Sequence, residues 1–384
     1  MVDVAQLLKT VVMAYLASWN FQNQSPLNIP SRCLTHVNYA FAKPSNGVIA
    51  YGDPATDVDL LIKNTKWSPG QPRYFQGMID ALTNPRGPIS RCNPNLKKLI
   101  AIGGWTDSGE FSTVASSAKA RRRFARSVIR YIHKHKFDGV DIDWEYPVGG
   151  GLETNAVSPD DKQNFVLLLQ ELRRQLDRYQ KLYKRKSPLL LTAATAISQS
   201  LTANLDLPAM ARTLDWFNLM IYDFAGPWMD VTAHNAPFKP GFVDAVQLYL
   251  DGGVDPSKLV TGVPLYAKEF LGAKSKLIGS GYNSSPEATP SFDDIQENFT
   301  KANGFEPIWD PTADAGYLYN EETNEFVTYE APNSSFIKAQ YALQKKLRGM
   351  FMWELSYDSK AVILQKLLQG LGLAKKSYRQ SCFC

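Results

Sequence analysis

The chain has 384 residues, of which 44% are hydrophobic and 21% charged, with a formal net charge of +5. Such a composition is typical of a globular protein, and the length suits a barrel of eight strands and eight helices with one insertion, or two domains. The small, dispersed positive charge argues against a nucleic-acid partner, and no run of about 18 apolar residues predicts a membrane-spanning helix.

The two ends of the chain carry few signals. Residues 1–8 lack the basic start, apolar core and small-residue cleavage site of a signal peptide, so we expect either an intracellular protein or one whose leader precedes this numbering. Four cysteines, Cys33, Cys92, Cys382 and Cys384, allow three disulfide pairings, which the sequence leaves open.

Short apolar runs recur along the chain, with longer helical patterns between them. Strands are expected at residues 11–17, 34–42, 96–102, 137–147, 189–196, 216–222, 259–266 and 348–355. Helices are expected at residues 116–135, at 160–183 after a cap that places Pro159 in the first turn, and at 334–346. Eight buried strands alternating with helices predict an α/β fold, a parallel (β/α)8 TIM barrel.

One interval breaks the regular spacing. The seventh and eighth strands are separated by about eighty residues that are rich in Gly, Ser, Asn, Pro and Tyr. Alternating patterns such as Tyr317-x-Tyr319 and Phe326-x-Thr328 within it are typical of strands. We therefore predict a small α+β insertion domain at residues 268–330, within a barrel formed by residues 1–267 and 331–384.

The fourth strand carries acidic residues at alternate positions. In an extended strand Asp141, Asp143 and Glu145 point to one face, and the apolar residues between them point to the other. The three acids could line the solvated face of an amphipathic strand. However, no Lys or Arg lies between them to relieve repulsion between neighbours roughly 6–7 Å apart. At least one carboxyl should then hold its proton above its ordinary pKa, as a general acid requires.

Aromatic residues collect at the C-terminal ends of the predicted strands, where barrel enzymes place their chemistry. They include Tyr15, Phe41, Trp105, Tyr222, Trp228, Tyr266 and Trp353. Each ring alone could serve core packing. Placed together around carboxyls, they describe a sugar site, because sugar C–H faces pack on aromatic planes and glycoside cleavage needs a proton donor.

Five motifs lie at or near these strand ends. They are Asp138-Gly-Val-Asp141-Ile-Asp143-Trp-Glu145, Gly103-Gly-Trp105, Met220-Ile-Tyr222-Asp223, Gly262-Val-Pro-Leu-Tyr266 and Gly349-Met-Phe-Met-Trp353-Glu354. The first resembles the DxxDxDxE signature of family 18 glycoside hydrolases, the chitinases and their relatives, and the others are similar to further motifs of that family. The resemblance runs from about Val11 to Leu371, and the long interval looks like the chitin insertion domain of one subgroup.

The resemblance implies a role for each acid. Glu145 would protonate the glycosidic oxygen, Asp143 would orient the N-acetyl group of the sugar, and Asp141 would share a proton with Asp143. Tyr222 would bond the acetamido oxygen, and that oxygen, rather than a second carboxylate, would act as the nucleophile. The substrate-binding positions would be Tyr15, Phe41, Trp105, Met220, Asp223, Trp228, Tyr266 and Trp353. Asp138 and Gly139 would be structural.

On this basis we expect a monomeric chitinase that hydrolyses β-1,4-linked N-acetylglucosamine polymers or oligomers, with no cofactor and no metal. The resemblance implies an extracellular protein, whereas the sequence itself leaves open an intracellular one. Two alternatives stay open: a chitin-binding lectin on the same barrel, and an endo-N-acetylglucosaminidase that acts on N-glycans. One departure from the family pattern stands at Tyr266-Ala267-Lys268, where many relatives have Tyr-Gly-Arg, and Lys cannot make the bidentate contact of Arg.

Overall fold

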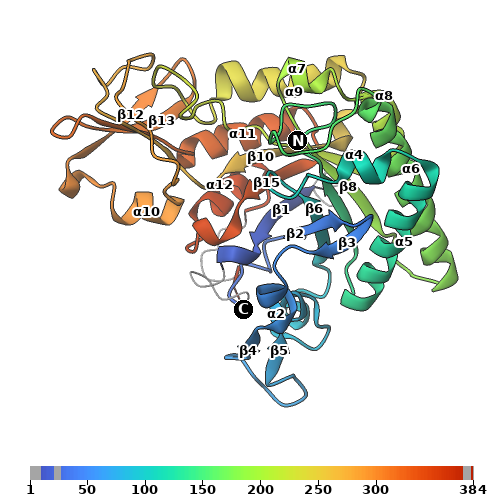
Figure 1. Cartoon of the computed structure of the whole chain (residues 1–384). Helices are drawn as coiled ribbons and strands as arrows, with labels where there is room; N and C mark the ends of the chain where they lie inside the picture. The colour runs from blue at the N-terminus through green and yellow to red at the C-terminus, as the bar shows by residue number, and fades with distance from the viewer. Residues whose placement is uncertain (1–9, 21–26, 375–381, 384) are drawn as a thin grey trace.

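The computed structural model describes residues 10–20, 27–374 and 382–383. They form a barrel of eight parallel strands surrounded by helices, with a small antiparallel sheet at one side (Figure 1). The predicted fold class, a TIM barrel with an insertion between the seventh and eighth strands, is confirmed. The predicted features at residues 1–8 and at Cys384 lie outside the described residues.

The barrel closes because its first strand pairs with both the second and the last. Its strands are β1 (Val11–Ala17), β2 (His36–Ser45), β6 (Lys97–Gly103), β7 (Gly139–Asp143), β8 (Leu190–Thr195), β9 (Trp216–Leu219), β10 (Leu259–Pro264) and β15 (Gly349–Trp353). A short strand, β3 (Val48–Tyr51), pairs antiparallel with β2. β9 ends three residues before its predicted end, because the backbone turns there and Tyr222 N–H bonds the carbonyl of Met220.

Helices cover the outside of the barrel. They are α2 (Gly77–Thr83), α3 (Pro88–Cys92), α4 (Phe111–Ala115), α5 (Ala118–His135), α6 (Asp161–Leu182), α7 (Gln199–Thr202), α8 (Leu207–Thr213), α9 (Val243–Asp251), α11 (Pro332–Gln344) and α12 (Val362–Gly370). A two-stranded hairpin, β4 (Leu61–Lys63) with β5 (Tyr74–Gln76), precedes α2. The prediction that Pro159 lies in the first turn of α6 is wrong. Asp160 is the N-cap, and the chain enters the helix through a bond from Ser158 N–H to the Asp161 carboxylate.

Barrel-strand side chains alternate between two hydrophobic regions. Residues such as Val12 and Ala14 face outward into the layer between strands and helices, whereas Met13 and Tyr15 face the inside of the barrel. On β7 the outward positions are apolar and belong to the outer layer, and Trp144 beyond the strand stacks on Phe111 at 5.4 Å. Asp141 and Asp143 therefore share the inner face, which confirms the predicted alternation for these two acids.

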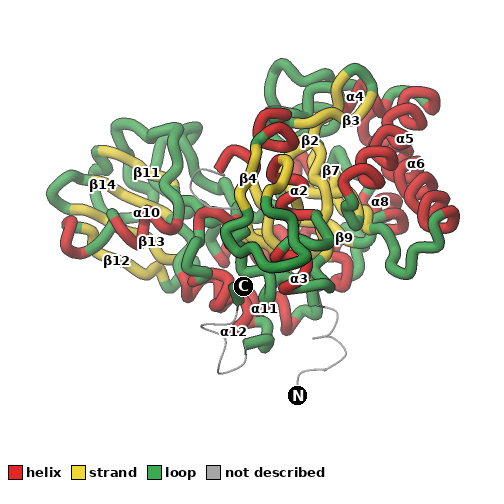
Figure 2. Tube along the Cα trace, turned by 90° about the horizontal axis from the view of Figure 1, so that it is seen from below, coloured by secondary structure: helices red, strands yellow, loops and turns green. Residues whose placement is uncertain are grey.

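The insertion between β10 and β15 contains a four-stranded antiparallel sheet of order β11-β14-β13-β12. Its elements are β11 (Lys268–Leu271), α10 (Phe292–Glu297), β12 (Phe305–Asp310), β13 (Ala315–Asn320) and β14 (Glu325–Thr328). All of them lie within the predicted bounds 268–330. Figures 1 and 2 place this sheet on the side of the barrel opposite α5 and α6.

A disulfide joins Cys33 to Cys382 across 349 residues of sequence, which is one of the three pairings that the sequence left open. It ties the segment before β2 to the C-terminal residues. Within the described ranges, no helix has both the length and the apolar character that crossing a membrane requires.

A buried ion pair lies where the insertion returns to the barrel. Lys338 on α11 bonds Glu330, which follows β14, and also donates to the Ala236 carbonyl at 2.7 Å. Ser335 donates to the other Glu330 oxygen at 2.9 Å. Both charged groups are almost fully buried, and burial raises the pKa of Glu330 and lowers that of Lys338. Three separate segments of chain thus meet at one pair of charges.

Replacing Lys338 by Met should lower the free energy of unfolding by about 3–5 kcal/mol, because the Glu330 carboxylate would stay buried without its partner. Urea titration measures the change. As a control, Lys360→Met removes an exposed pair with Glu297 and should cost less than about 1 kcal/mol. A loss in Lys338→Met no larger than in the control would contradict the prediction.

Candidate active site

Three carboxyls lie at the C-terminal end of β7. Asp141 and Asp143 point into the barrel, and Glu145 follows two residues after the strand ends. Asp141 and Asp143 are buried, whereas Glu145 is partly exposed. The barrel thus holds two acids inside and presents the third at its mouth.

Asp141 is held by side chains from three other barrel strands, β1, β8 and β9. One of its oxygens accepts a bond from the Tyr15 hydroxyl at 2.6 Å. The other accepts from the Thr192 hydroxyl at 2.5 Å and from the Asn218 amide at 3.0 Å. Burial raises the pKa of Asp141, and these bonds partly offset that effect because they stabilise the ionised form. The position of this carboxyl is therefore fixed before any ligand binds.

Asp143 differs from Asp141 in having a free acceptor. Its Oδ1 atom is buried and has no hydrogen-bond partner within the described part of the protein. Burial, followed by the negative charges of Glu145 and Asp141, raises the pKa of Asp143 well above its ordinary value. A buried polar atom left without a partner is costly. The site therefore gains if a ligand supplies the missing bond.

Glu145 holds its proton near neutral pH. Burial and the negative charge of Asp223 raise its pKa to about 7, while a contact with Tyr146 lowers it. The Glu145 main chain is fixed on both sides: its N–H donates to the Ser108 hydroxyl at 2.9 Å, and its carbonyl accepts from Asn155 at 3.0 Å. A carboxyl that is partly protonated at neutral pH and reaches the surface can act as a general acid.

A second group of polar side chains surrounds Asp223, which follows β9. The Tyr266 hydroxyl donates to Asp223 at 2.7 Å, and the Lys268 ammonium lies 3.1 Å from the same carboxylate oxygen. Tyr222, the preceding residue, packs edge-on against Tyr266 at 6.2 Å. Burial and the charge of Asp143 raise the pKa of Tyr222, so its hydroxyl stays a donor. Lys268, at the position of the family's Arg, thus makes a single charge contact with Asp223.

Aromatic rings form a layer beside the carboxyls. Trp353 stacks on Phe41 at 5.5 Å and meets Tyr15 edge-on at 5.4 Å. Trp19, in the turn after β1, stacks on the same Phe41 at 6.0 Å and is 54% exposed. Three of these rings come from β1, β2 and β15, and Trp19 follows β1; closure of the barrel places β1 between the other two strands.

The remaining predicted positions are divided between the two ends of the barrel. Trp105 is 48% exposed, and its ring centroid lies 6.5 Å from that of Tyr146. Trp228 is 62% exposed, and the Lys268 ammonium lies 5.5 Å from the centroid of its ring. Met220 packs against the inner barrel cluster. Asp138 and Gly139 lie at the other end of β7, where Asp138 pairs with Arg185 at 3.1 Å. The predicted site residues therefore gather at the C-terminal ends of the strands, except for those two.

Comparison with known proteins identifies the family of the chain. The model of glycosyl hydrolases family 18 matches residues 11–358. The chain belongs to this family.

Relatives of this family 18 member span its whole barrel. Chitinase A1 of Niallia circulans is 35% identical, and the match covers 94% of this chain but only 58% of that protein. Chitinase ChiA74 from Bacillus thuringiensis superimposes with a TM-score of 0.83 at 28% identity, covering 96% of this chain and 71% of that one. A family 18 chitinase from Cycas revoluta in complex with (GlcNAc)3 superimposes with a TM-score of 0.79 at 27% identity. The match covers 94% of this chain and 100% of that one.

Sequence reasoning missed several residues of the site. Thr192 and Asn218, which bond Asp141, occupy inward positions of β8 and β9, so strand alternation could have found them. Trp19, two residues after β1, belongs to the aromatic residues expected at the strand ends but not to the expected binding positions. Ser108 sits in the loop after β6, and nothing in the sequence links it to Glu145. Among the described residues, no group of three His, Cys, Asp or Glu side chains is arranged to hold a metal ion.

Ser108→Ala should lower kcat for glycoside hydrolysis at least about tenfold with little change in KM, because it frees the Glu145 main chain. The buried Ser108 hydroxyl also bonds the Gly104 and Asp143 carbonyls at 2.8 and 3.1 Å, so the free energy of unfolding should fall by about 1–3 kcal/mol. Steady-state kinetics and urea titration measure both. The control Ser116→Ala removes an exposed serine and should change neither; an unchanged kcat in Ser108→Ala would refute the positioning role.

Proposed function

We propose that this family 18 member is a chitinase that hydrolyses β-1,4-linked N-acetylglucosamine polymers or oligomers with retention of configuration. The observation that carries the proposal is the pair formed by Asp143, with its unpartnered buried oxygen, and Glu145, with a pKa of about 7. A related chitinase of the same fold holds (GlcNAc)3, a sugar whose acetamido groups can fill such a vacant acceptor.

In the first step Glu145 donates its proton to the glycosidic oxygen, and the leaving sugar departs. Glu145, now ionised, accepts a proton from the attacking water in the second step. A pKa of about 7 suits both duties, because the group can exist in either form near neutral pH.

The nucleophile is supplied by the substrate. The acetamido oxygen attacks the anomeric carbon and forms an oxazolinium ion, so no second carboxylate bonds the sugar. Asp143 accepts the acetamido N–H on its free oxygen and stabilises the positive charge, and Tyr222 donates its hydroxyl to the acetamido oxygen. Asp141 and Asp143 share protons as the charge changes, so their titrations are coupled.

The aromatic layer supplies the sugar contacts. Trp353 forms the floor beneath the sugar at the cleavage point, and Phe41 and Trp19, which stack beside it, extend the aromatic surface. Tyr266, Asp223 and the exposed rings of Trp105 and Trp228 complete the binding positions together with Met220 and Tyr15. Chitooligosaccharides are therefore the partners we propose, and we expect the protein to act as a monomer.

The main rival from another class is a chitin-binding lectin. Against it stands Glu145 beside the two buried acids, because its pKa of about 7 suits a proton donor, and a protein that only binds does not need one. The other rival, an endo-N-acetylglucosaminidase acting on N-glycans, would use the same acids and differ only in the sugar that it accepts.

Glu145→Gln should reduce turnover of chitin oligomers by at least about a thousandfold while binding survives, because the amide keeps the shape of the side chain and cannot donate the proton. Product release measures turnover, and calorimetry measures binding. The matched control, Glu153→Gln, makes the same exchange at an exposed position of the loop after β7 and should leave turnover unchanged. Near-normal turnover in Glu145→Gln would overturn the mechanism.

A parallel assay with a high-mannose glycopeptide separates the substrate classes. A chitinase releases products from chitin oligomers and leaves the glycopeptide intact. Cleavage of the glycopeptide alone would assign the endo-N-acetylglucosaminidase activity instead. Binding of chitin oligomers without cleavage of either substrate would instead indicate a lectin.

The rate should depend on pH through Glu145. Its acid form is complete below the pKa of about 7 and is lost above it, so kcat/KM should fall about tenfold for each pH unit beyond that value. Asp223→Asn removes a negative charge that raises the Glu145 pKa, so the alkaline fall should move to lower pH. A pH–rate profile of both proteins measures this, and an alkaline limb that stays in place would contradict the link.

A further inference from the structure

Positive charge is concentrated on two neighbouring helices. Residues 111–136, which include α5, contain eight Lys and Arg and no Asp or Glu. Residues 171–186, at the end of α6 and just after it, contain seven Lys and Arg and two acids. Because the whole chain has a formal charge of only +5, the rest of the protein is net negative. The low overall charge therefore hides a strongly basic face.

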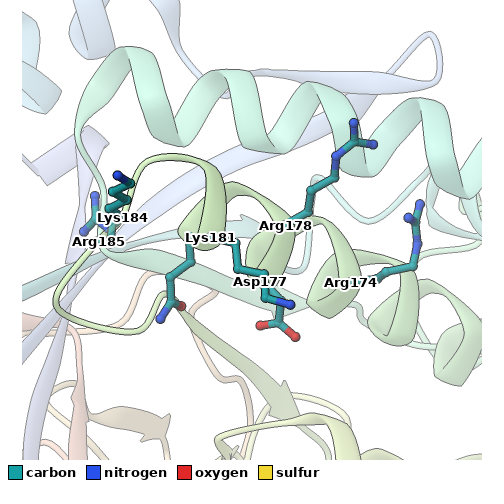
Figure 3. A pocket seen from close by; sticks show the side chains of 7 residues that line it. Arg174, Asp177, Arg178, Lys181, Lys184 and Arg185 are labelled. Atoms are coloured by element: carbon teal, nitrogen blue, oxygen red, sulfur yellow. The ribbon is translucent and has the colours of Figure 1, made fainter.

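This face is hollowed by two grooves. The larger, of about 850 Å³, is lined by Arg174, Asp177, Arg178, Lys181, Lys184 and Arg185 (Figure 3). The smaller, of about 300 Å³, lies between the two helices and is lined by residues that include Arg130, His133, Arg178, Tyr179 and Tyr183. Arg178 borders both and in Figure 3 extends toward α5, so the grooves adjoin around one side of α6.

Several of these cationic side chains form no ion pair with a carboxylate of the described residues. Within the described ranges, no carboxylate forms an ion pair with Arg130, Arg178, Lys181 or Lys184, whereas Arg185 is engaged by Asp138. Lys181 and Lys184 also lie at the C-terminal end of α6, where cations stabilise the helix dipole. That effect does not account for Arg130, on another helix, or for Arg178, which lies a turn earlier. The uncompensated charge thus extends beyond a helix cap.

Aromatic rings lie among the cations. Tyr183 is 52% exposed, and its ring centroid lies 4.4 Å from that of Tyr179 and 5.2 Å from that of His133. The Tyr179 hydroxyl is hydrogen-bonded to His133 at 2.8 Å, which holds these two rings in place beside Tyr183. An exposed ring packs on a sugar face, and Arg and Lys bind anionic substituents. The combination suits a sugar chain that carries acidic groups.

We propose that the α5–α6 face binds a linear acidic polysaccharide, with Arg130, Arg178, Lys181 and Lys184 on its acidic groups and Tyr183 on a sugar ring. The exposed ring set among the cations favours a sugar chain over a lipid surface, which offers no sugar face to pack on it. Single-stranded nucleic acid stacks successive bases on successive rings. Of Tyr179 and Tyr183, Tyr183 alone is exposed, so this pair offers a single ring and is less suited to nucleic acid.

The face is separate from the active site. A helix that follows a parallel strand runs back along the barrel, so the end of α6 lies near the start of β7, at the end of the barrel opposite Glu145. The pairing of Arg185 with Asp138 marks that end. A polysaccharide held there would anchor the protein and leave the catalytic carboxyls free.

The test compares two triple variants of equal charge. Arg178→Glu, Lys181→Glu and Lys184→Glu together should weaken binding to heparin at least about tenfold at moderate salt, because three contacts become repulsive. The control, Lys63→Glu, Lys301→Glu and Lys345→Glu, makes the same change in net charge at scattered exposed positions and should weaken it less than about twofold. Equal losses in both variants, or no retention of the wild-type protein, would overturn the proposal.

Ring contacts are tested separately. Tyr183→Ala should weaken heparin binding about threefold or more, whereas Tyr74→Ala, which removes a ring that is 51% exposed on β5, should have no effect. An unchanged affinity in Tyr183→Ala would leave a patch of charge that does not recognise sugar, and the proposal would fail.

Binding measurements with other polymers distinguish between the classes of partner. Binding to heparin or to polygalacturonate, with none to neutral dextran, supports an acidic polysaccharide. Tighter binding to oligodeoxythymidine or to vesicles containing phosphatidylserine would overturn it. Hydrolysis of a small soluble substrate should be the same in the wild type and the triple variant, so this test is independent of the proposed chitinase activity.

Discussion

Two carboxyl groups, those of Asp141 and Asp143, lie inside the barrel, and no basic side chain among the described residues pairs with either. Burial raises both pKa values, so the fold carries a cost at its centre. Hydrogen bonds to Tyr15, Thr192 and Asn218 reduce that cost for Asp141 alone. Asp143 keeps an unpartnered oxygen, and the neighbouring Glu145 keeps its proton to about pH 7. The chemistry of the site follows from this arrangement.

The barrel makes the arrangement stable by surrounding it with rigid contacts. Outward residues of the strands join a continuous hydrophobic layer beneath the helices, while inward residues leave room for polar groups from β1, β7, β8 and β9 to meet. Beyond the strands, Ser108 and Asn155 fix the main chain of Glu145. Groups that must keep their geometry during a reaction are thus held by strands and by hydrogen bonds rather than by free loops.

Charge is distributed unevenly around this centre. The site end of the barrel carries acids and aromatic rings, while α5 and the end of α6 carry most of the excess positive charge. Figures 1 and 2 place these helices away from the insertion sheet. A net charge of +5, which argued against a nucleic-acid partner, is an average over two unlike faces. A formal charge summed over the chain cannot report such a separation, because adjacency of helices is a property of the fold.

By itself the sequence determined the eight strands, the position of the insertion and the shared face of Asp141 and Asp143, because these follow from local periodicity and spacing. Only the tertiary structure decided which groups meet: Ser108 with Glu145, Asn218 with Asp141, Lys268 with Asp223, Cys33 with Cys382. It also decided where β9 stops and how α6 is capped. Periodicity records which face a side chain takes, but contacts between segments far apart in the chain, and the pKa shifts that burial causes, exist only after the barrel has closed.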